Sequence, residues 1–162
     1  MVTSLQTSMT LLLGLLTGVY HQHWNNHWGV RGASFYGDHQ LFERLYSDVQ
    51  VEIDTLAEKI VSNFGSDALS PVEQTRQAAS YLESWERHSL DRVMRSLQAE
   101  EDLQQALKAI FDHLEDSENL SLGLNDFLAA VANLHETHLY LLRQRLTVSR
   151  VATQYALNKR DS

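Results

Sequence analysis

The chain has 162 residues with one proline, no cysteine, and a formal net charge of -8 when its eight histidines are counted as neutral. This length is sufficient for one domain with a buried core. The absence of cysteine excludes disulfide bonds and thiolate metal sites and is typical of a protein from the reducing cytoplasm, while the acidic charge disfavours general binding to nucleic acid.

Hydrophobic residues recur at helical spacing along nearly the whole chain, and strand-like alternation is absent. We therefore predict a first helix near 3–28, a second near 36–64, a short helix near 70–84, and long third and fourth helices near 90–115 and 124–149. The three glycines of "GVRGASFYG" indicate a turn after the first helix. This order predicts an all-α fold, a four-helix bundle with a short extra helix between the second and third helices. We expect one domain over residues 1–162, with short flexible tails at both ends.

The only long apolar run, "LLLGLLTGVY" at residues 11–20, raises the question of a membrane or secretion segment. It is far shorter than the roughly 20 residues that a membrane-spanning helix needs. No lysine or arginine precedes it, since the first is Arg31, and no A-x-A cleavage pattern follows it. We interpret the run as a buried part of the first helix, with a secretion signal as the alternative.

Five side chains of types that bind metal ions lie within or just before the second predicted helix: His27, His39, Glu43, Asp54 and Glu58. His39 and Glu43 are four residues apart, as are Asp54 and Glu58, so each pair lies on one helix face one turn apart. His27 precedes the turn and can fold back near His39. His39 and Asp54, however, are separated by roughly 22 Å along the helix axis. One chain therefore cannot gather all five side chains around one ion.

A symmetric dimer with antiparallel second helices would solve this problem, because the histidines of one subunit would meet the acids of its partner. Each of the two equivalent sites would offer imidazole and carboxylate ligands, a set that suits iron and tolerates zinc or manganese. For any single pair, the alternative is a solvated acidic surface with packed or capping histidines. A di-iron site within one subunit is disfavoured, because such bundles use Glu-x-x-His motifs and no histidine here has an acid three residues before it.

The same segment resembles the signature of the Dps family, the ferritin-like mini-ferritins. The similarity lies in "HWGVRGASF", in a second histidine twelve residues after the first, and in the acids that follow within "DTLAEKI". The stretch "HETHLYLLR" at residues 135–143 is similar to a second family motif, and the resemblance extends over about residues 11–146. It implies a ferritin-like bundle that assembles into a hollow homo-oligomeric shell of about twelve subunits, with metal sites shared across two-fold axes.

For function, the resemblance implies an iron-storage and detoxification protein that takes part in iron homeostasis and protection from oxidative stress. Such a ferroxidase oxidises Fe²⁺, preferably with hydrogen peroxide, and stores ferric mineral inside the shell. His27 and His39 would bind iron from one subunit, Asp54 and Glu58 would bind it from the partner, and Glu43 would add an acidic ligand. Zinc is the expected substitute for iron at this site.

Other residues have roles that are implied by the resemblance or by position. Trp28 matches a tryptophan beside the family's site, where it could donate an electron; the alternative is core packing. His23 lies one turn before His27 and is a candidate auxiliary ligand, with a core or capping role as the alternative. Asp116 and Asp126 lie where the family has three-fold pores, and acids there would attract Fe²⁺; a helix-start preference for acids is the alternative.

Two further expectations concern partners. Residues 1–10 contain no basic residue and residues 149–162 contain three, so we expect weak or absent DNA binding and no membrane binding. His138 lies on the apolar face of the fourth helix, and we interpret it as a satisfied core histidine. The alternative function is a non-catalytic Dps-like cage or a helical interaction module, with the site inactive or filled by zinc.

Overall fold

A computed structural model describes residues 5–88 and 91–158 of the chain, with side chains described to residue 147. Helices account for most of these residues. The elements are α1 (Leu5–Gly29), α2 (Phe35–Phe64), the short 3-10 turn η1 (Ser66–Ala68), α3 (Pro71–His88), α4 (Arg92–Asp116) and α5 (Leu122–Asn158). Within the described residues there is no strand. The predicted all-α class, the order of the helices and the short extra helix are confirmed.

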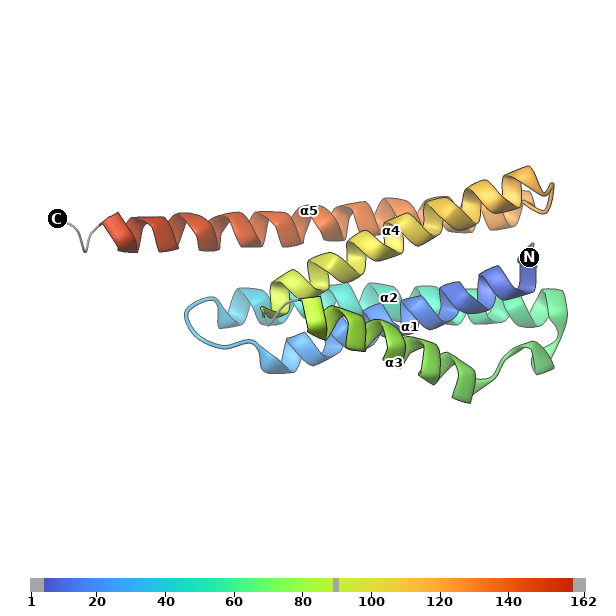
Figure 1. Ribbon diagram of the computed structural model, residues 1–162, viewed down its shortest axis with the longest axis horizontal. Coiled ribbons are helices and arrows are strands. Elements are labelled where there is room, and N and C mark those ends of the chain that lie inside the picture. Colours follow the sequence, from blue (N-terminus) through green and yellow to red (C-terminus); the bar gives the residue numbers. More distant parts are fainter. Residues whose placement is uncertain (1–4, 89–90, 159–162) are drawn as a thin grey trace.

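The four long helices form the bundle, and α3 lies along the outside of α1 (Figure 1). α1 runs antiparallel to α2, and α4 runs antiparallel to α5 (Figure 1). α1 packs against α2, α3 and α4, and this central position explains why it is apolar on more than one side. The main core is built from inward-facing apolar side chains of all five helices, among them Leu16, Leu56, Trp85, Leu103 and Phe127.

The apolar run in α1 is buried over most of its length, as predicted, although Leu11 at its start is 40% exposed. The leucines at positions 12, 13, 15 and 16 are at most 3% exposed. Two glycines in the same run allow α3 to approach closely, since a Cβ on Gly14 would lie 2.7 Å from Cβ of Gln77 and a Cβ on Gly18 would lie 3.3 Å from the Trp85 ring. Among the described residues, no helix is long and apolar enough to cross a membrane.

The helix boundaries follow local signals. Gly65 ends α2 with φ of 82°, a conformation that favours glycine. Pro71 opens α3, and the Ser70 hydroxyl accepts a hydrogen bond from the backbone N–H of Glu73 at 3.3 Å. These two boundaries match the predicted ones.

The last helix is longer than predicted. α5 continues to Asn158, whereas the sequence pattern suggested an end near residue 149 and a flexible tail beyond it. The physical reason is that α5 contains no proline, and no glycine after its first turn, so nothing terminates it earlier. The outer parts of the two predicted tails, residues 1–4 and 159–162, lie outside the described residues.

A small network of hydrogen bonds joins α5 to the beginning of α2. Asp38, in the first turn of α2, is buried and accepts a hydrogen bond at 2.9 Å from Nη2 of Arg145 on α5. The same Nη2 donates to the Ser34 hydroxyl at 2.9 Å, and that hydroxyl donates to Asp38 at 2.8 Å. We call Ser34, Asp38 and Arg145 the clasp. The clasp holds the α1–α2 turn against α5, and its Asp38 directly precedes His39 in the sequence.

Candidate metal centres

His27 and His39 lie side by side at the α1–α2 turn. Their rings stack with centroids 3.7 Å apart and planes 21° apart. Nδ1 of His27 lies 2.9 Å from the carbonyl oxygen of His39, and Nδ1 of His39 lies 3.0 Å from the carbonyl oxygen of His27. Because a carbonyl only accepts, each Nδ1 carries the proton and each Nε2 presents its lone pair. The expected proximity is found, and the pair is fixed in the tautomer that binds metal through Nε2.

A chain of aromatic rings leads away from this imidazole pair. The Tyr46 ring lies 5.3 Å from that of His27, Trp24 lies 6.5 Å from Tyr46, and Trp28 lies 4.5 Å from Trp24. Trp28 is 60% exposed, so the alternative of simple core packing does not describe it. Its described ring partner is Trp24. Two aromatic rings lie next to the imidazoles: Tyr46 beside His27, and Phe35, which stacks on His39 at 5.2 Å.

The acidic candidates lie elsewhere on α2. Glu43, Asp54 and Glu58 are all exposed. α2 is one unbroken helix, so His39 and Asp54 lie about 22 Å apart along it. Within one chain the structure therefore brings the two histidines together but leaves Asp54 and Glu58 at the other half of the helix. Their role as ligands stays a prediction.

The exposed side of α2 also carries apolar side chains. Tyr36 is 71% exposed and Val51 is 67% exposed. At 3.6 residues per turn, both lie on the same side of α2 as His39 and Asp54, opposite the buried stripe that contains Leu56. An exposed helix face that carries both apolar side chains and two sets of metal-binding side chains is suited to contact with another subunit.

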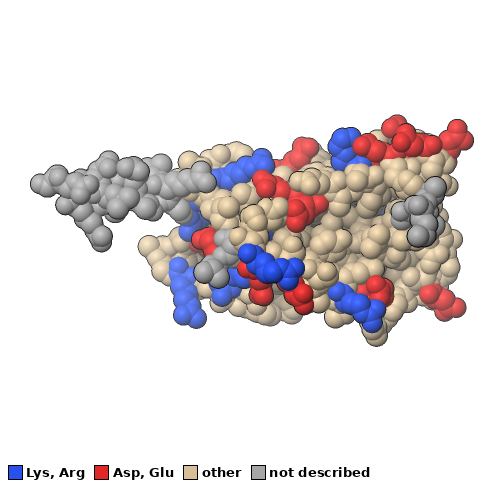
Figure 2. All heavy atoms as spheres, in the orientation of Figure 1, with Lys and Arg blue, Asp and Glu red and all other residues tan. Residues whose placement is uncertain are grey.

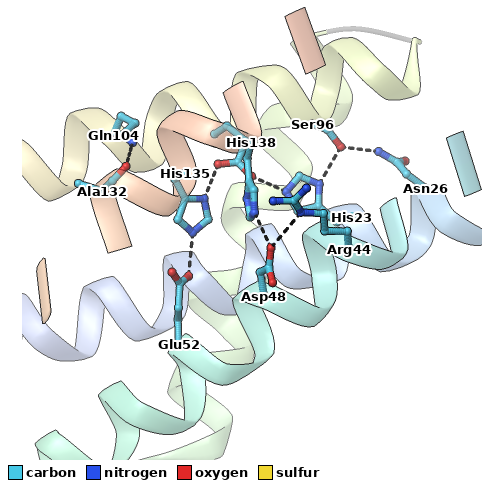
Figure 3. Close-up of polar contacts among 11 residues, drawn as sticks. His23, Asn26, Arg44, Asp48, Glu52, Ser96, Gln104, Ala132, His135 and His138 are labelled. Atoms are coloured by element: carbon cyan, nitrogen blue, oxygen red, sulfur yellow. Dashed lines mark hydrogen bonds and ion pairs between the residues drawn. The ribbon is translucent and has the colours of Figure 1, made fainter. Parts of the chain in front are cut away.

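A second group of metal-binding side chains lies inside the bundle (Figure 3). His23 of α1, Glu100 of α4, and His135 and His138 of α5 are all fully buried. Nε2 of His23 and Nδ1 of His138 lie 2.7 and 3.1 Å from the same oxygen, Oε1 of Glu100. Nδ1 of His135 contacts the other carboxylate oxygen, Oε2. Three imidazoles thus converge on one carboxylate.

The outward-facing nitrogens of these rings also have partners. Nδ1 of His23 lies 3.0 Å from the Ser96 hydroxyl, which accepts a further hydrogen bond from Asn26 at 2.7 Å. Two acids of α2 complete the group: Glu52 lies 2.8 Å from Nε2 of His135, and Asp48 lies 3.1 Å from Nε2 of His138. We call His23, Asp48, Glu52, Glu100, His135 and His138 the interior cluster.

The charges inside the interior cluster oppose the effect of burial. Burial alone would raise the pKa of Glu100, but the positive charge of His135 and hydrogen bonds from the three histidines hold it well below its usual range. Burial alone would lower the pKa of His135, but Glu100 and Glu52 raise it to about 10. For His23, burial outweighs the hydrogen bond to Glu100, and its pKa is lowered.

The interior cluster bears on the sequence-based interpretation of three histidines, of which that of His23 needs correction. His23 was a candidate auxiliary ligand beside His27, but its ring nitrogens contact Glu100 and Ser96 inside the bundle, because its position on α1 faces α4. His138 is a satisfied core histidine, as expected, because it is fully buried and its two ring nitrogens face the carboxylates of Glu100 and Asp48. His135 was given no role, although it contacts two carboxylates.

The sequence contains a signal that could have identified the cluster. In α4, Val93, Leu103 and Leu107 are buried on one face of the helix. Glu100 is buried on the same face, about one turn after Ser96 and one turn before Leu103. A charged residue within an apolar stripe requires a buried partner. A Glu-x-x-His motif does not describe the cluster, because α5 carries His-x-x-His at positions 135 and 138 instead.

Acidic side chains gather at the end of the molecule where α4 turns into α5 (Figure 2). Asp116 and Asp126, both predicted to line a pore, are exposed there, as are Asp112, Glu115 and Glu118. Lys108 pairs with Asp112 at 2.8 Å. The region is therefore a locally negative surface, and its role as a pore stays a prediction.

Comparison with known proteins places these features in a family. The ferritin-like domain family model matches residues 12–151. The DNA protection during starvation protein of Brevibacillus brevis is 29% identical over 147 residues, which cover 88% of this chain and 97% of that protein. General stress protein 20U of Bacillus subtilis (strain 168) is 26% identical over 131 residues, covering 80% of this chain and 88% of that protein.

Solved structures give the same result at the level of the fold. A Dps protein from Bacillus brevis has 26% sequence identity and a TM-score of 0.68, with 90% of this chain and 99% of that chain covered. Dps from Thermosynechococcus elongatus has a TM-score of 0.74 with 19% identity, covering 87% of this chain and 88% of that chain. At this lower identity, the likeness supports the fold alone.

Proposed function

The chain belongs to the ferritin-like family as a member of its Dps group, and we propose that it is a mini-ferritin that oxidises Fe²⁺ at sites shared by two subunits. The fold and the relatives support a role in iron storage or protection. The observation that carries the finer proposal is the stacked imidazole pair, which presents two Nε2 lone pairs from one subunit. The acids that would complete the site lie at the other half of the same exposed helix face.

The geometry of α2 supports the shared site. When two copies of α2 cross antiparallel about a two-fold axis, His27 and His39 of one subunit meet Asp54 and Glu58 of the partner subunit. The exposed side chain of Val51 provides apolar contact between these two sites, and Tyr36 provides it beyond His39. Glu43, one turn after His39, adds a carboxylate at the edge of each site. About six such dimers would form the proposed twelve-subunit shell.

The donor set suits the substrate. Imidazole nitrogen and carboxylate oxygen bind Fe²⁺ well, and the added negative charge of the carboxylates favours the Fe³⁺ product. Two ferrous ions give one electron each to hydrogen peroxide, which takes up two protons and becomes two molecules of water. Because both electrons reach the same peroxide, no hydroxyl radical is released. Zinc would occupy the same ligands without electron transfer.

Other parts of the molecule have supporting roles in this proposal. The aromatic chain from Tyr46 through Trp24 to Trp28 offers a route by which a stray oxidising equivalent leaves the site. Asp116 and Asp126 would raise the local Fe²⁺ concentration at an entry pore. The cytoplasm is the proposed location, and we propose that DNA binding is weak or absent at physiological salt.

Mixing two inactive variants tests the shared site. His27→Ala/His39→Ala removes the imidazoles, and Asp54→Ala/Glu58→Ala removes the acids. In a mixed dimer, one site carries both lesions and the other carries none. Co-refolded equal mixtures should therefore regain up to about one quarter of the wild-type rate of peroxide-driven Fe²⁺ oxidation, since about half of the dimers are mixed.

The control for this test is each variant refolded alone, which should stay inactive. The presence of mixed dimers is verified by native mass spectrometry with one variant labelled with ¹⁵N. If verified mixed dimers show no activity above that of the separate variants, the shared site is wrong. If both variants alone keep the wild-type rate, oxidation takes place elsewhere.

A further inference from the structure

We propose that the interior cluster binds one divalent first-row transition-metal ion within each subunit, through Nε2 of His23, Nδ1 of His138 and Oε1 of Glu100. This ion would be separate from the iron oxidised at the shared surface site. All four helices of the bundle contribute to the cluster, but no second subunit is needed.

The first argument is the position of the donor atoms. The donor atoms of His23, Glu100 and His138 all lie within 4.8 Å of one another. Metal–nitrogen and metal–oxygen bonds of about 2.0–2.2 Å place the donors of a tetrahedral ion about 3.3 Å apart. The distances of 2.7 and 3.1 Å from the two nitrogens to Oε1 of Glu100 therefore need to lengthen by about 0.6 and 0.2 Å to admit an ion.

The second argument is the set of partners around the donors. A metal-binding histidine usually donates its other ring N–H to a carboxylate or another oxygen, which fixes the ring. Here Ser96 holds the second nitrogen of His23, and Asp48 holds that of His138. His135 contacts the second oxygen of Glu100 and thereby orients this carboxylate. His135 is a positioning residue in this proposal, not a ligand.

The third argument is a count of hydrogen-bond donors at His138. Both ring nitrogens face carboxylate oxygens, of Glu100 and of Asp48. An ionised carboxylate only accepts, and a neutral imidazole has one donor and one lone pair. A neutral His138 would thus direct a lone pair at one of two carboxylates, either the buried Glu100 or the partly exposed Asp48. A cation bound to Nδ1 and Oε1 removes this conflict, because both atoms then donate lone pairs to it.

The ligand types narrow the class of ion. Two imidazoles and one carboxylate suit Zn²⁺, Fe²⁺, Mn²⁺ or Co²⁺ and disfavour Ca²⁺ and Mg²⁺, which prefer all-oxygen ligands. Entry from solvent is available at Asp48, because its side chain is 31% exposed and contacts Nε2 of the fully buried His138.

Cobalt is a suitable probe, because the intensity of its visible absorption reports the coordination number. The protein is stripped with a chelator in the His27→Ala/His39→Ala background, which removes the surface imidazoles. We expect one Co²⁺ per subunit after gel filtration, with the intense visible bands of a four- or five-coordinate ion. Adding Glu100→Gln should lower affinity at least tenfold and abolish these bands, while adding His88→Gln, on the exposed surface of α3, should change neither.

A second measurement covers the case in which Glu100→Gln fails to fold, as judged by circular dichroism. Anomalous scattering from Co²⁺-soaked crystals of the background protein should then give a peak between His23 and His138. The proposal is overturned if the background protein binds no Co²⁺, if a folded Glu100→Gln variant keeps the bands, or if the anomalous peak lies elsewhere. None of these results would affect the proposed surface oxidation, whose imidazoles are absent from this background.

Discussion

The surface imidazole pair and the interior cluster use the same side-chain types in opposite ways. His27 and His39 are partly exposed, lie twelve residues apart in sequence, and are oriented by each other's backbone carbonyls. The interior cluster is buried, involves four helices, and is held by carboxylates. The pair can therefore be altered with little effect on packing, whereas each member of the cluster also carries part of the stability of the bundle. An exposed, incomplete site suits an ion that is converted and released, and an enclosed one suits an ion that is retained.

The largest expected effect comes from removing the acid at the centre of the interior cluster. Glu100→Ala should reduce the free energy of unfolding of the metal-free protein by about 3–5 kcal/mol, because three buried imidazoles lose their common acceptor. Urea denaturation at pH 7 measures this. The matched control is Glu101→Ala, which breaks a surface pair with Arg143 and should cost about 0–1 kcal/mol. Equal effects of the two changes would contradict the distinction between the two regions.

The second prediction concerns the surface pair. His39→Ala should lower the initial rate of peroxide-driven Fe²⁺ oxidation by about 100-fold or more, since losing even an outer partner of a metal ligand costs about 10–100-fold. The free energy of unfolding should change by less than about 1 kcal/mol. Stopped-flow absorbance of the ferric product and urea denaturation measure the two effects. His88→Ala serves as the control, and a wild-type rate in an intact His39→Ala oligomer would show that the site is misplaced.

The third prediction is a pH dependence that belongs to the interior cluster alone. Because the pKa of His135 is raised from 6.5 to about 10, its stabilising effect is complete below pH 6.5 and is lost as pH rises toward 10. The free energy of unfolding of the metal-free protein should fall by about 1 kcal/mol per pH unit between pH 7 and 9.5.

Two other members of the cluster act at lower pH. The lowered pKa of Glu100 gives stability that is lost only as pH falls below its ordinary value of 4.5, and the lowered pKa of His23 gives stability that declines as pH falls below 6.5. Neither group changes its protonation between pH 7 and 9.5, so neither adds to the slope in that range. The slope in that range should therefore become markedly flatter in His135→Gln, and an unchanged slope would show that His135 is not its source.

The smallest expected effect is at the acidic end of the molecule. Asp126→Asn should slow the initial uptake of Fe²⁺ about two- to fivefold at low ionic strength, because one charge near the proposed pore is lost. The difference should vanish above about 0.5 M salt, where screening is strong. Asp67→Asn, at an exposed position in η1, is the control of equal charge. A salt-independent difference would indicate a structural effect instead.

The helices could be predicted well from the sequence, because local patterns determine where each one begins and ends. Helical periodicity located the helices, and Gly65 and Pro71 marked boundaries that the structure confirms. The contact between His27 and His39 was also predictable, since a single turn separates them. The interior cluster was not predicted, because it depends on how far each helix rotates about its axis when the bundle packs. His23 is 77 residues from Glu100 in sequence, and no local pattern relates the directions in which their side chains point.

The clasp of Arg145, Asp38 and Ser34 links two segments that are 107 residues apart in sequence. When the part of α5 around Arg145 detaches, Asp38 keeps its hydrogen bond from Ser34 but loses those from Arg145, and the first turn of α2 loses its contact with α5. Amide hydrogens near His39 and near Arg145 should therefore exchange with solvent in one cooperative opening event rather than independently. The lifetime of the imidazole pair should therefore match the lifetime of the contact between α5 and the start of α2, although its two histidines are only twelve residues apart in sequence.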